Sequence, residues 1–282
     1  MAARRLALIG KPVSHSLSPP MYNGFFSDKG LNIVYDAIEV SEGEVGGVIG
    51  RLRSSGYIGF NVTMPHKKVI AGYLDELDVH ASEIGAVNTV KLGSRAIGFN
   101  TDWLGVLGPL RDVAGLRSPV DTTLVLGAGG AGSAAVYAIA AGGLASRVYV
   151  SSRSGLTSRE LAFKASSRWG LDAEHVDIDR ARSVAYKADI VVNATPVGWG
   201  DGRSPIEGAR FKEGCVAFDM VYKPLFTRLL LEAASRGCIV VDGLWMLVYQ
   251  ASENLRIWLG LEASPVELRS YAASRLRGGG AA

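Results

Sequence analysis

Short apolar runs rich in valine and isoleucine alternate along this chain with longer segments whose apolar residues recur every three to four positions. The short runs predict strands at residues 6–9, 33–40, 58–62, 123–126, 147–150, 189–192, 216–219 and 238–241. The longer segments predict helices at residues 19–29, 66–77 and 131–141. Strands that alternate with helices in this way are typical of βαβ units and parallel sheets, so the expected fold class is α/β.

A change of pattern near residue 103 predicts a domain boundary. Before it, the alternation ends in a predicted hairpin, residues 86–92 and 96–99, with a Gly-Ser turn between them. After it, residues 103–114 predict a linking helix, and a new strand opens at Thr122.

Two α/β domains that flank a cleft are therefore expected. The first domain comprises residues 1–103 and the second residues 104–242. Residues 243–282 read as helices, which could cover either domain.

Composition narrows the class of partner. Of the 282 residues, 48% are hydrophobic and 20% are charged, and the net charge is only +3, with no basic tail. We therefore expect no nucleic-acid partner. No apolar run approaches the roughly 18 residues of a membrane helix, so no membrane partner is expected.

The first ten residues are too short, and too soon followed by Lys11-Pro12, for a signal peptide. Cys215 and Cys238 lack metal-like spacing and make no disulfide framework, so a cytoplasmic location fits best.

A glycine-rich turn carries the clearest chemical signal. The sequence G-A-G-G-A-G at residues 127–132 follows a predicted strand and opens a predicted helix, as in dinucleotide-binding sites. The first glycine permits the tight turn, the second lets the backbone approach a pyrophosphate, and the third lets helix and sheet pack closely. A plain glycine-rich turn is the alternative. The expected cofactor contacts at the turn are Gly127, Ala128, Gly129, Gly130, Ala131 and Gly132.

The end of the next strand favours NADP over NAD. An NAD site usually has Asp or Glu there to bind the ribose 2′-hydroxyl, whereas this chain has Ser152, Arg153 and Ser154. A guanidinium binds a 2′-phosphate in bidentate fashion, and serine hydroxyls assist it. The alternative is that Arg153 is a solvated surface residue.

The predicted helix at residues 66–77 carries its charges against the helix dipole. Lys67 and Lys68 fall in its first turn, and Asp75 and Glu76 fall near its end. A lysine at a positive helix end has its ammonium form disfavoured, which suits proton transfer. Two exposed lysines that tolerate a small cost are an equally good interpretation.

Other polar residues allow both a structural and a ligand-binding interpretation. Ser18 before Pro19 predicts a helix N-cap, and Asp102 could likewise cap the linking helix. Gln250 is the only glutamine of the chain and lies in an apolar helical stretch, where it needs a ligand or a backbone carbonyl as its partner. The four histidines show no metal or Ser-His-Asp spacing, so no metal is expected.

Eight segments in order resemble the shikimate dehydrogenase family. They are HSLSP (15–19), NVTMPHK (61–67), GAVNT (85–89), NTD (100–102), GAGGAG (127–132), NATPVGW (193–199), DMVYKP (219–224) and DGLWMLVYQA (242–251). The resemblance implies that residues 1–103 form a substrate-binding catalytic domain completed by residues 243–282. It also implies that residues 104–242 form a Rossmann-type NADP-binding domain.

The resemblance implies a role for each matching position. Lys67 and Asp102 match the catalytic pair beside the oxidised hydroxyl. Ser16 and Ser18 match the serines that hold the shikimate carboxylate. Further substrate contacts are implied at Thr63, Asn88, Tyr222 and Gln250. The cofactor contacts implied on the nicotinamide side are Asn193, Thr195 and Gly243.

The implied reaction is the reversible NADPH-dependent reduction of 3-dehydroshikimate to shikimate in chorismate and aromatic amino-acid biosynthesis. The family's NADP form commonly has Asn-Arg-Thr and then a second basic residue, where this chain has Ser152-Arg153-Ser154 and Thr157. An NAD-preferring quinate/shikimate dehydrogenase therefore stays as an alternative, as does a non-catalytic NADP-binding regulator. The expected partner is a small-molecule substrate, and the expected assembly is a monomer or a homodimer.

Overall fold

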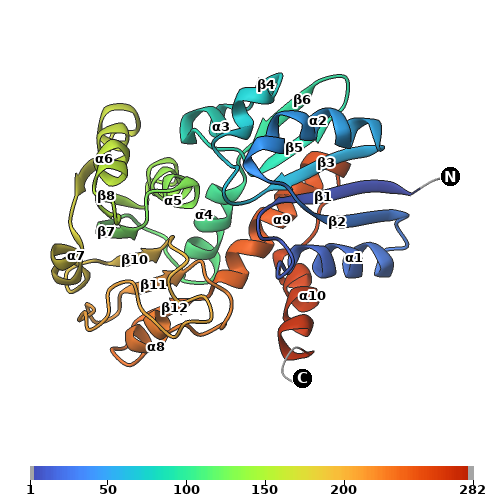
Figure 1. The fold of residues 1–282 in the computed structure, drawn as a ribbon. Helices are drawn as coiled ribbons and strands as arrows, with labels where there is room; N and C mark the ends of the chain where they lie inside the picture. The colour runs from blue at the N-terminus through green and yellow to red at the C-terminus, as the bar shows by residue number, and fades with distance from the viewer. Residues whose placement is uncertain (1–2, 279–282) are drawn as a thin grey trace. The chain divides into compact units, whose positions relative to one another are not determined.

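A computed structural model describes residues 3–278 of the chain, in two compact units. Unit 1 comprises the residues up to Thr101 and those from Gln250 onward, and unit 2 comprises Asp102–Tyr249. The chain crosses from one unit to the other at residues 101/102 and 249/250. The sequence pattern predicted these two boundaries at 103/104 and 242/243. Figure 1 labels the elements of both units.

Unit 1 is built on a six-stranded mixed sheet in the order β2-β1-β3-β5-β6-β4. Its strands are β1 (Arg4–Gly10), β2 (Ile33–Glu39), β3 (Tyr57–Val62), β4 (Glu76–Leu77), β5 (Thr89–Leu92) and β6 (Ala96–Phe99). Its helices are α1 (Ser18–Asp28), α2 (Val45–Ser54), α3 (Val79–Ile84), α10 (Pro265–Gly278) and the second half of α9 (Gly243–Leu259), with 3-10 turns at Glu42–Glu44 and Ile70–Tyr73. Strands β1, β2 and β3 are parallel, whereas the predicted hairpin β5–β6 adds two antiparallel pairings.

Aromatic packing anchors the C-terminal helices to unit 1. The ring of Tyr22 on α1 stacks on Tyr35 of β2 with 4.5 Å between centroids. The indole of Trp258 on α9 donates to the carbonyl oxygen of Val90 at 2.9 Å. A Cβ at Gly59 would lie 2.4 Å from that indole, so only glycine on β3 leaves room for it. Burial of large aromatic side chains therefore ties residues near the end of the chain to the first sheet.

Unit 2 contains a fully parallel six-stranded sheet in the order β12-β11-β10-β7-β8-β9. Its strands are β7 (Val120–Leu126), β8 (Ala145–Ser151), β9 (Asp172–His175), β10 (Ile190–Asn193), β11 (Val216–Asp219) and β12 (Ile239–Val241). Its helices are α4 (Asp102–Asp112), α5 (Gly130–Ala141), α6 (Leu156–Trp169), α7 (Ile178–Ala185) and α8 (Arg228–Ala234), followed by the first half of α9. Counted from β7, the order is 3-2-1-4-5-6, which is the Rossmann order. The predicted α/β class is confirmed.

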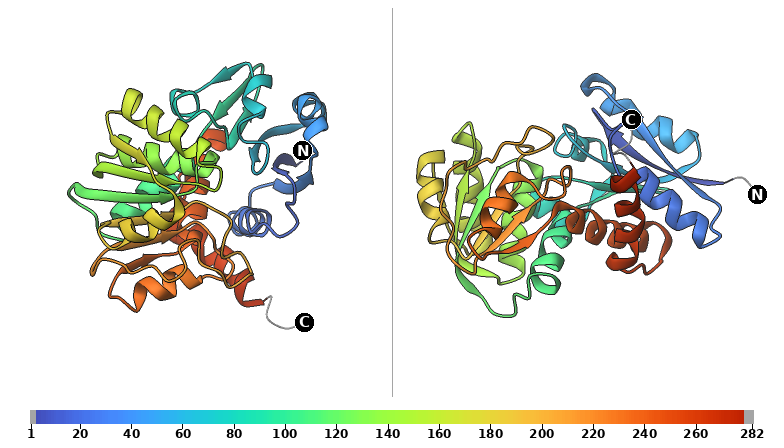
Figure 2. Two further views of the ribbon diagram at one scale, coloured as in Figure 1. Left: turned by 60° about the vertical axis from the view of Figure 1, so that its left-hand side comes forward. Right: turned by 90° about the horizontal axis from the view of Figure 1, so that it is seen from below.

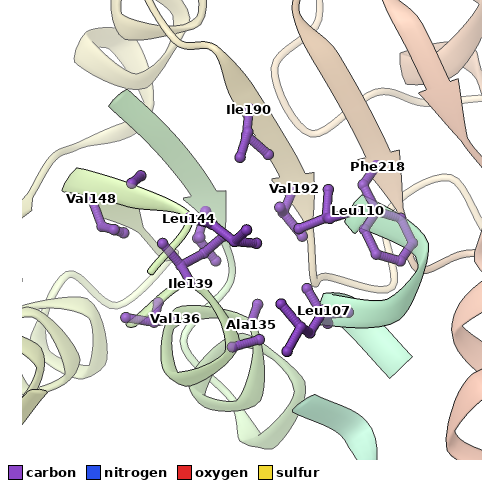
Figure 3. Packing of buried hydrophobic residues seen from close by; sticks show 14 of the residues in the cluster. Leu107, Leu110, Ala135, Val136, Ile139, Leu144, Val148, Ile190, Val192 and Phe218 are labelled. Atoms are coloured by element: carbon purple, nitrogen blue, oxygen red, sulfur yellow. The ribbon is translucent and has the colours of Figure 1, made fainter. Parts of the chain in front are cut away.

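Both faces of this second sheet are covered by helices (Figure 2). Val125, Ile190 and Val192 belong to one cluster with residues of α4 and α5. Figure 3 shows Ile190 and Val192 in this cluster. Leu124 and Val191 face the other side, in a cluster with residues of α7 and α8. Because successive side chains of a strand point to opposite faces, burial on both faces requires the continuous apolar runs that the sequence displays.

The prediction of a helix over residues 66–77 is wrong. The segment forms turns, a 3-10 turn at Ile70–Tyr73 and the short strand β4. The amide groups of Asp75 and Asp78 donate to carbonyl oxygens of Ala96 and Gly98 on β6. These tertiary hydrogen bonds replace the helical ones, so the dipole argument for a proton-transferring lysine at this site does not hold.

Cys215 and Cys238 are both buried and free, and they lie side by side before neighbouring strands β11 and β12. Their sulfur atoms are 2.7 Å apart, with the Cys238 thiol also donating to the Lys212 carbonyl oxygen. Burial raises the pKa of the Cys215 thiol well above its usual range. The spacing of these cysteines in the sequence gave no sign of this contact.

Within residues 3–278, none of the helices combines the length and the apolar character that crossing a membrane requires. The same residues contain no group of three or more His, Cys, Asp or Glu side chains placed to hold a metal ion.

Candidate functional site

The glycine-rich turn lies between β7 and α5, where the strand order of unit 2 reverses. Gly127 has a φ of +108°, and a Cβ there would lie 2.8 Å from the carbonyl oxygen of Ala194. A Cβ at Gly132 would lie 2.1 Å from the carbonyl oxygen of Gly127, so the third glycine closes the turn on itself. A Cβ at Gly129 would meet no atom within 4 Å, which leaves that face of the turn open to a ligand.

The start of α5 suits an anionic group. Gly129 is the N-cap residue and offers no side-chain cap, and no acidic residue occupies the first turn. The first amide groups of a helix lack intrahelical acceptors and form the positive end of its dipole. Because the turn also sits at the carboxyl edge of a parallel sheet, at its switch point, its residues fit a dinucleotide pyrophosphate.

Gly132→Ala tests the closed geometry of this turn. The methyl group would overlap the Gly127 carbonyl, which is backbone and cannot move aside without opening the turn. We expect the free energy of unfolding to fall by about 1–3 kcal/mol, as is typical of overpacking. Urea unfolding measures this. Gly129→Ala is the matched control, because nothing lies within 4 Å of its Cβ position, and its unfolding curve should stay close to that of the wild type.

The predicted 2′-phosphate residues lie beside the glycine turn. Leu126 of β7 pairs with Ser151 of β8, and the Gly127 amide donates to the Ser151 carbonyl oxygen at 2.7 Å. Ser152, Arg153 and Ser154 therefore begin one strand away from the turn. One dinucleotide bound at the turn would bring its adenosine ribose to this loop.

Hydroxyl groups organise this loop. The Thr157 hydroxyl lies 2.9 Å from the Ser152 hydroxyl and 3.0 Å from that of Ser154. Arg153 is exposed at the surface, and no carboxylate stands between Ser151 and Arg159. The loop therefore offers hydroxyl donors and one guanidinium, a donor set that fits a phosphate dianion.

Asn193 and Thr195 follow β10, on the other side of the switch point. Asn193 is wholly buried. Its amide donates to Asp219 at 2.9 Å and to the Val197 carbonyl oxygen at 3.1 Å, and its oxygen accepts from the Thr195 hydroxyl at 2.7 Å. The role of Asn193 in this structure is to hold the loop, with Thr195 as its half-buried neighbour. At Gly243, a Cβ would lie 2.4 Å from the Met220 carbonyl oxygen, which requires glycine at the start of α9.

Asp219 gives unit 2 a testable pH dependence. Burial raises the pKa of this carboxyl group from 3.8 to about 6. The hydrogen bonds that it accepts from Thr227, Val221 and Asn193 lower the pKa and offset part of this rise. The folded state thus binds the proton more tightly than the unfolded state, so stability falls as pH rises from about 4 to about 6. The loss from this group is about 3 kcal/mol, since each pKa unit corresponds to about 1.4 kcal/mol.

Chemical denaturation of the wild type and Asp219→Asn at pH 4, 5, 6 and 7 measures the difference. Asparagine has no ionisation, so the stability of the wild type should drop relative to the variant across this interval and then level off. Glu160→Gln, at an exposed position, is the control and should run parallel to the wild type. Parallel curves for Asp219→Asn would contradict the raised pKa.

In unit 1, the predicted substrate residues Thr63 and Asn88 lie at the same edge of the sheet. Strands β1 and β3 are parallel and end at this edge, where β5 begins and β6 ends. Thr63 follows β3, and its amide donates to Ile9 of β1 at 2.9 Å. The Asn88 side chain, before β5, accepts from the amide of Thr101, beyond β6, at 2.8 Å. The topology thus collects residues that are far apart in the sequence.

Lys67 is held at the same edge by its backbone. Its carbonyl oxygen accepts from the Val87 amide at 2.7 Å, and Val87 directly precedes Asn88. The preceding residue, His66, is buried, with Nε2 2.6 Å from the carbonyl oxygen of Val40. The Lys67 side chain is half-buried, whereas Lys68 is exposed. Tertiary hydrogen bonds therefore fix Lys67 without an α-helix.

Ser16 precedes α1, and Ser18 is its first residue. Helix α1 begins at Ser18, so the interpretation of Ser18 as the N-cap is wrong, and Leu17 takes that place without a side-chain cap. The Ser16 hydroxyl accepts from the Ser18 amide at 3.2 Å. Ser18 itself is buried, and Ser16 is half-buried.

Two predicted site residues besides the nucleotide set belong to unit 2. Asp102 is the first residue of α4 and is 4% exposed, and a carboxylate in the first turn is favoured by the helix dipole. Tyr222 lies after β11, and its ring packs edge-on against Trp199 with 4.7 Å between centroids.

One buried polar residue of unit 1 was not predicted from the sequence. Asn254 lies one helical turn after Gln250 on α9, is wholly buried, and donates to the Gln250 side-chain oxygen at 2.8 Å. Gln250 therefore has a side-chain partner, where we expected a ligand or a backbone carbonyl. The spacing of four residues between two polar side chains on an apolar helix was the available signal.

The sheet order of unit 2, the glycine turn at its switch point and the phosphate-compatible loop define a dinucleotide-binding α/β protein. Comparison with known proteins identifies the family within this class. The family model for the shikimate dehydrogenase substrate binding domain matches residues 8–90. The NADP(+) shikimate dehydrogenase of Aeropyrum pernix is 50% identical over 277 residues, which cover 98% of both chains. This chain belongs to the shikimate dehydrogenase family.

Solved structures agree with the fold. A crystal structure of shikimate 5-dehydrogenase from Thermus thermophilus in complex with NADP(H) and shikimate matches with a TM-score of 0.85. It is 37% identical and covers 96% of this chain and 99% of its own. Quinate dehydrogenase from Corynebacterium glutamicum in complex with NAD matches with a TM-score of 0.88 at 28% identity, covering 97% of this chain and 100% of its own.

Proposed function

We propose that this chain is an NADP-dependent shikimate dehydrogenase that reversibly reduces 3-dehydroshikimate to shikimate in chorismate and aromatic amino-acid biosynthesis. The observation that carries the proposal is the 50% identity to an NADP(+) shikimate dehydrogenase across 98% of both chains. The residues of unit 2 support the cofactor, and those of unit 1 support the substrate.

NADPH supplies the hydride in this reaction. Residues 127–132 would hold its pyrophosphate with backbone amides, and Arg153 with Ser152 and Ser154 would hold the 2′-phosphate. Their support is the open face at Gly129, the uncapped start of α5 and the absence of a carboxylate from the loop. The proposed positions toward the nicotinamide are Asn193, Thr195 and Gly243, with the buried Asn193 acting through the loop that it holds.

The proposed substrate residues have three roles: they bind the carboxylate, bind the ring hydroxyls, or transfer the proton. Ser16 and Ser18 donate to the carboxylate, while Thr63, Asn88, Tyr222 and Gln250 bind the ring hydroxyls or the carboxylate. Lys67, oriented by Asp102, delivers a proton to the C3 oxygen as the hydride reaches C3, and takes that proton back in the reverse direction. A charged group placed at the reacting oxygen stabilises the charge that develops there.

The expected setting follows from the same proposal. We propose a cytoplasmic enzyme with a small-molecule substrate, without a nucleic-acid partner, that acts as a monomer or a homodimer. Size-exclusion chromatography with light scattering distinguishes the two assemblies.

The reductive direction tests the proposal by its product. The protein would be incubated with NADPH and 3-dehydroshikimate, and the products separated by chromatography. The expected result is shikimate, formed in equal amount to the NADPH consumed, and none without the protein. Consumption of NADPH without shikimate would contradict the proposal.

A further inference from the structure

A buried amide in unit 1 joins two of the proposed substrate residues. Asn254 lies on α9 and is wholly buried, and Gln250, one turn earlier, is 8% exposed. Asn88, at the edge of the sheet, is 2% exposed. The proposed function uses Gln250 and Asn88 but leaves Asn254 without a role.

The hydrogen bonds of Asn254 use its full capacity. Its amide nitrogen donates to the Gln250 side-chain oxygen at 2.8 Å and to the Tyr22 hydroxyl at 3.1 Å. Its oxygen accepts from the hydroxyls of Thr89 at 2.7 Å and Thr101 at 2.8 Å. An asparagine side chain has two N–H donors and one oxygen with two lone pairs, so all four are occupied.

The partners fix the direction of each bond. The Asn88 amide nitrogen donates to the Thr101 hydroxyl at 2.9 Å, and the Asn61 amide nitrogen donates to the Thr89 hydroxyl at 3.0 Å. Each hydroxyl accepts from one of these amides, and the nearest acceptor for its own O–H is the Asn254 oxygen, at 2.7 Å from Thr89 and 2.8 Å from Thr101, whereas the Asn88 oxygen lies at 3.0 and 3.3 Å. A rotation of the Asn254 amide by 180° would set its oxygen against that of Gln250, which is unfavourable in a buried site.

Tyr22 closes the network on its other side. Burial raises the pKa of its hydroxyl well above the usual range, so the group stays protonated. It accepts from Asn254 and lies 3.4 Å from the Ala251 carbonyl oxygen, to which it donates. The network thus runs from the sheet edge through Tyr22 of α1 to the backbone of α9, and each of its side chains has a hydrogen-bond partner.

We propose that Asn254 is a positioning residue for the substrate site, an inference that rests on the proposed function. Asn254 donates to the Gln250 side-chain oxygen and so fixes the orientation of the Gln250 amide. In this orientation the N–H groups of Gln250 can donate to the substrate. Through the Thr101 hydroxyl Asn254 also supports the Asn88 amide, whose oxygen is held by the Thr101 backbone amide. Gln250 therefore binds an oxygen of the substrate as a donor, and loss of Asn254 lets that amide rotate.

The side-chain amide of Gln250 reports this directly, because Gln250 is the only glutamine of the chain. Protein made by cell-free synthesis from glutamine labelled with 15N at the side-chain amide gives a single NH2 signal by NMR. In the wild type, we expect shifts distinct from those of free glutamine, and a further change on adding shikimate. In Asn254→Ala, we expect both shifts to move toward free glutamine. An unchanged signal in this variant would overturn the proposal.

Steady-state kinetics with a double-mutant cycle give the functional readout. We expect Asn254→Ala and Gln250→Ala each to lower kcat/KM for shikimate about tenfold, with KM for NADP⁺ unchanged. The double variant should lose no more than about threefold beyond Gln250→Ala, because residues that act through one another are not additive. Ser252→Ala is the matched control, since its hydroxyl on the same helix bonds to Ala263, outside the network, and its kcat/KM should be that of the wild type.

The outcomes are separable from failure of the proposed function. Multiplicative losses in the double variant would show that Asn254 acts as structure alone and would overturn the proposal. A wild type that leaves shikimate unchanged, with no shikimate effect on the amide signal, would instead contradict the proposed function and the role of Asn254 with it. If Asn254→Ala does not fold, Asn254→Ser takes its place in both experiments with the same expected outcomes.

Discussion

Replacing Lys67 with alanine is expected to lower kcat for shikimate oxidation by about 10²–10⁴-fold, the usual contribution of a positioned proton-transfer group. The KM for shikimate should change by only a few-fold, because the other proposed contacts to the substrate remain. The basis is positional: Lys67 is tied by its carbonyl oxygen to Val87, next to Asn88 at the edge of the first sheet. Steady-state rates with saturating NADP⁺ measure the effect.

Lys68→Ala is the matched control for this prediction. Lys68 is the neighbouring residue, carries the same charge and is exposed, so its removal should leave kcat near the wild-type value. If both variants retain turnover within a few-fold, Lys67 does not transfer the proton. If both lose it equally, the effect comes from general charge or folding of this segment.

Replacing Arg153 with alanine is expected to raise KM for NADP⁺ by about 10–100-fold and to leave KM for NAD⁺ nearly unchanged. A hydrogen bond to a charged group is worth about 1.5–3 kcal/mol, and only NADP⁺ carries the 2′-phosphate. The serine and threonine hydroxyls of the loop bond to one another and carry no charge of their own, so they cannot replace the guanidinium.

Arg168→Ala provides the comparison, because Arg168 is exposed near the far end of α6. It should have the wild-type KM for both cofactors. An equal rise in KM for NADP⁺ and NAD⁺ in Arg153→Ala would mean that Arg153 shapes the loop without reading the 2′-phosphate. No change for either would leave Arg153 a solvated surface residue.

The apolar pattern predicted most of the sheet framework. Residues 124–126 of β7 and 190–192 of β10 are buried on both faces, so they form continuous apolar runs that stand out from the chain. Strand β9, with the sequence DAEH, is a half-exposed edge strand and carries no such signal. Strand β4 has two residues and forms only because β6 pairs with it. Edge strands and very short strands form because a neighbouring strand pairs with them, and the local sequence carries no information about that neighbour.

The glycine turn was the most predictable part of the site. Its chemistry is local, because each glycine is required by atoms within the turn or directly beside it. Lys67 was identified as a candidate for a reason that the structure contradicts, since residues 66–77 form no α-helix. The resemblance to the family, and not the dipole argument, supported its assignment.

Asn254 was missed for a further physical reason. Its partners Tyr22, Thr89 and Thr101 come from parts of the sequence more than 150 residues away. A polar residue in an apolar helix reveals that it needs partners, but only the folded structure provides their identity.

The proposed activity is tested most sharply by the rate of NADP⁺ or NAD⁺ reduction at 340 nm with shikimate or quinate, in all four combinations. An NADP-dependent shikimate dehydrogenase reduces NADP⁺ rapidly with shikimate and gives slow rates in the other three combinations. A preference for NAD⁺ or for quinate would contradict the proposed activity and favour an NAD-preferring quinate/shikimate dehydrogenase. Absence of turnover in all four, with NADPH still bound, would contradict it in favour of a non-catalytic NADP-binding regulator.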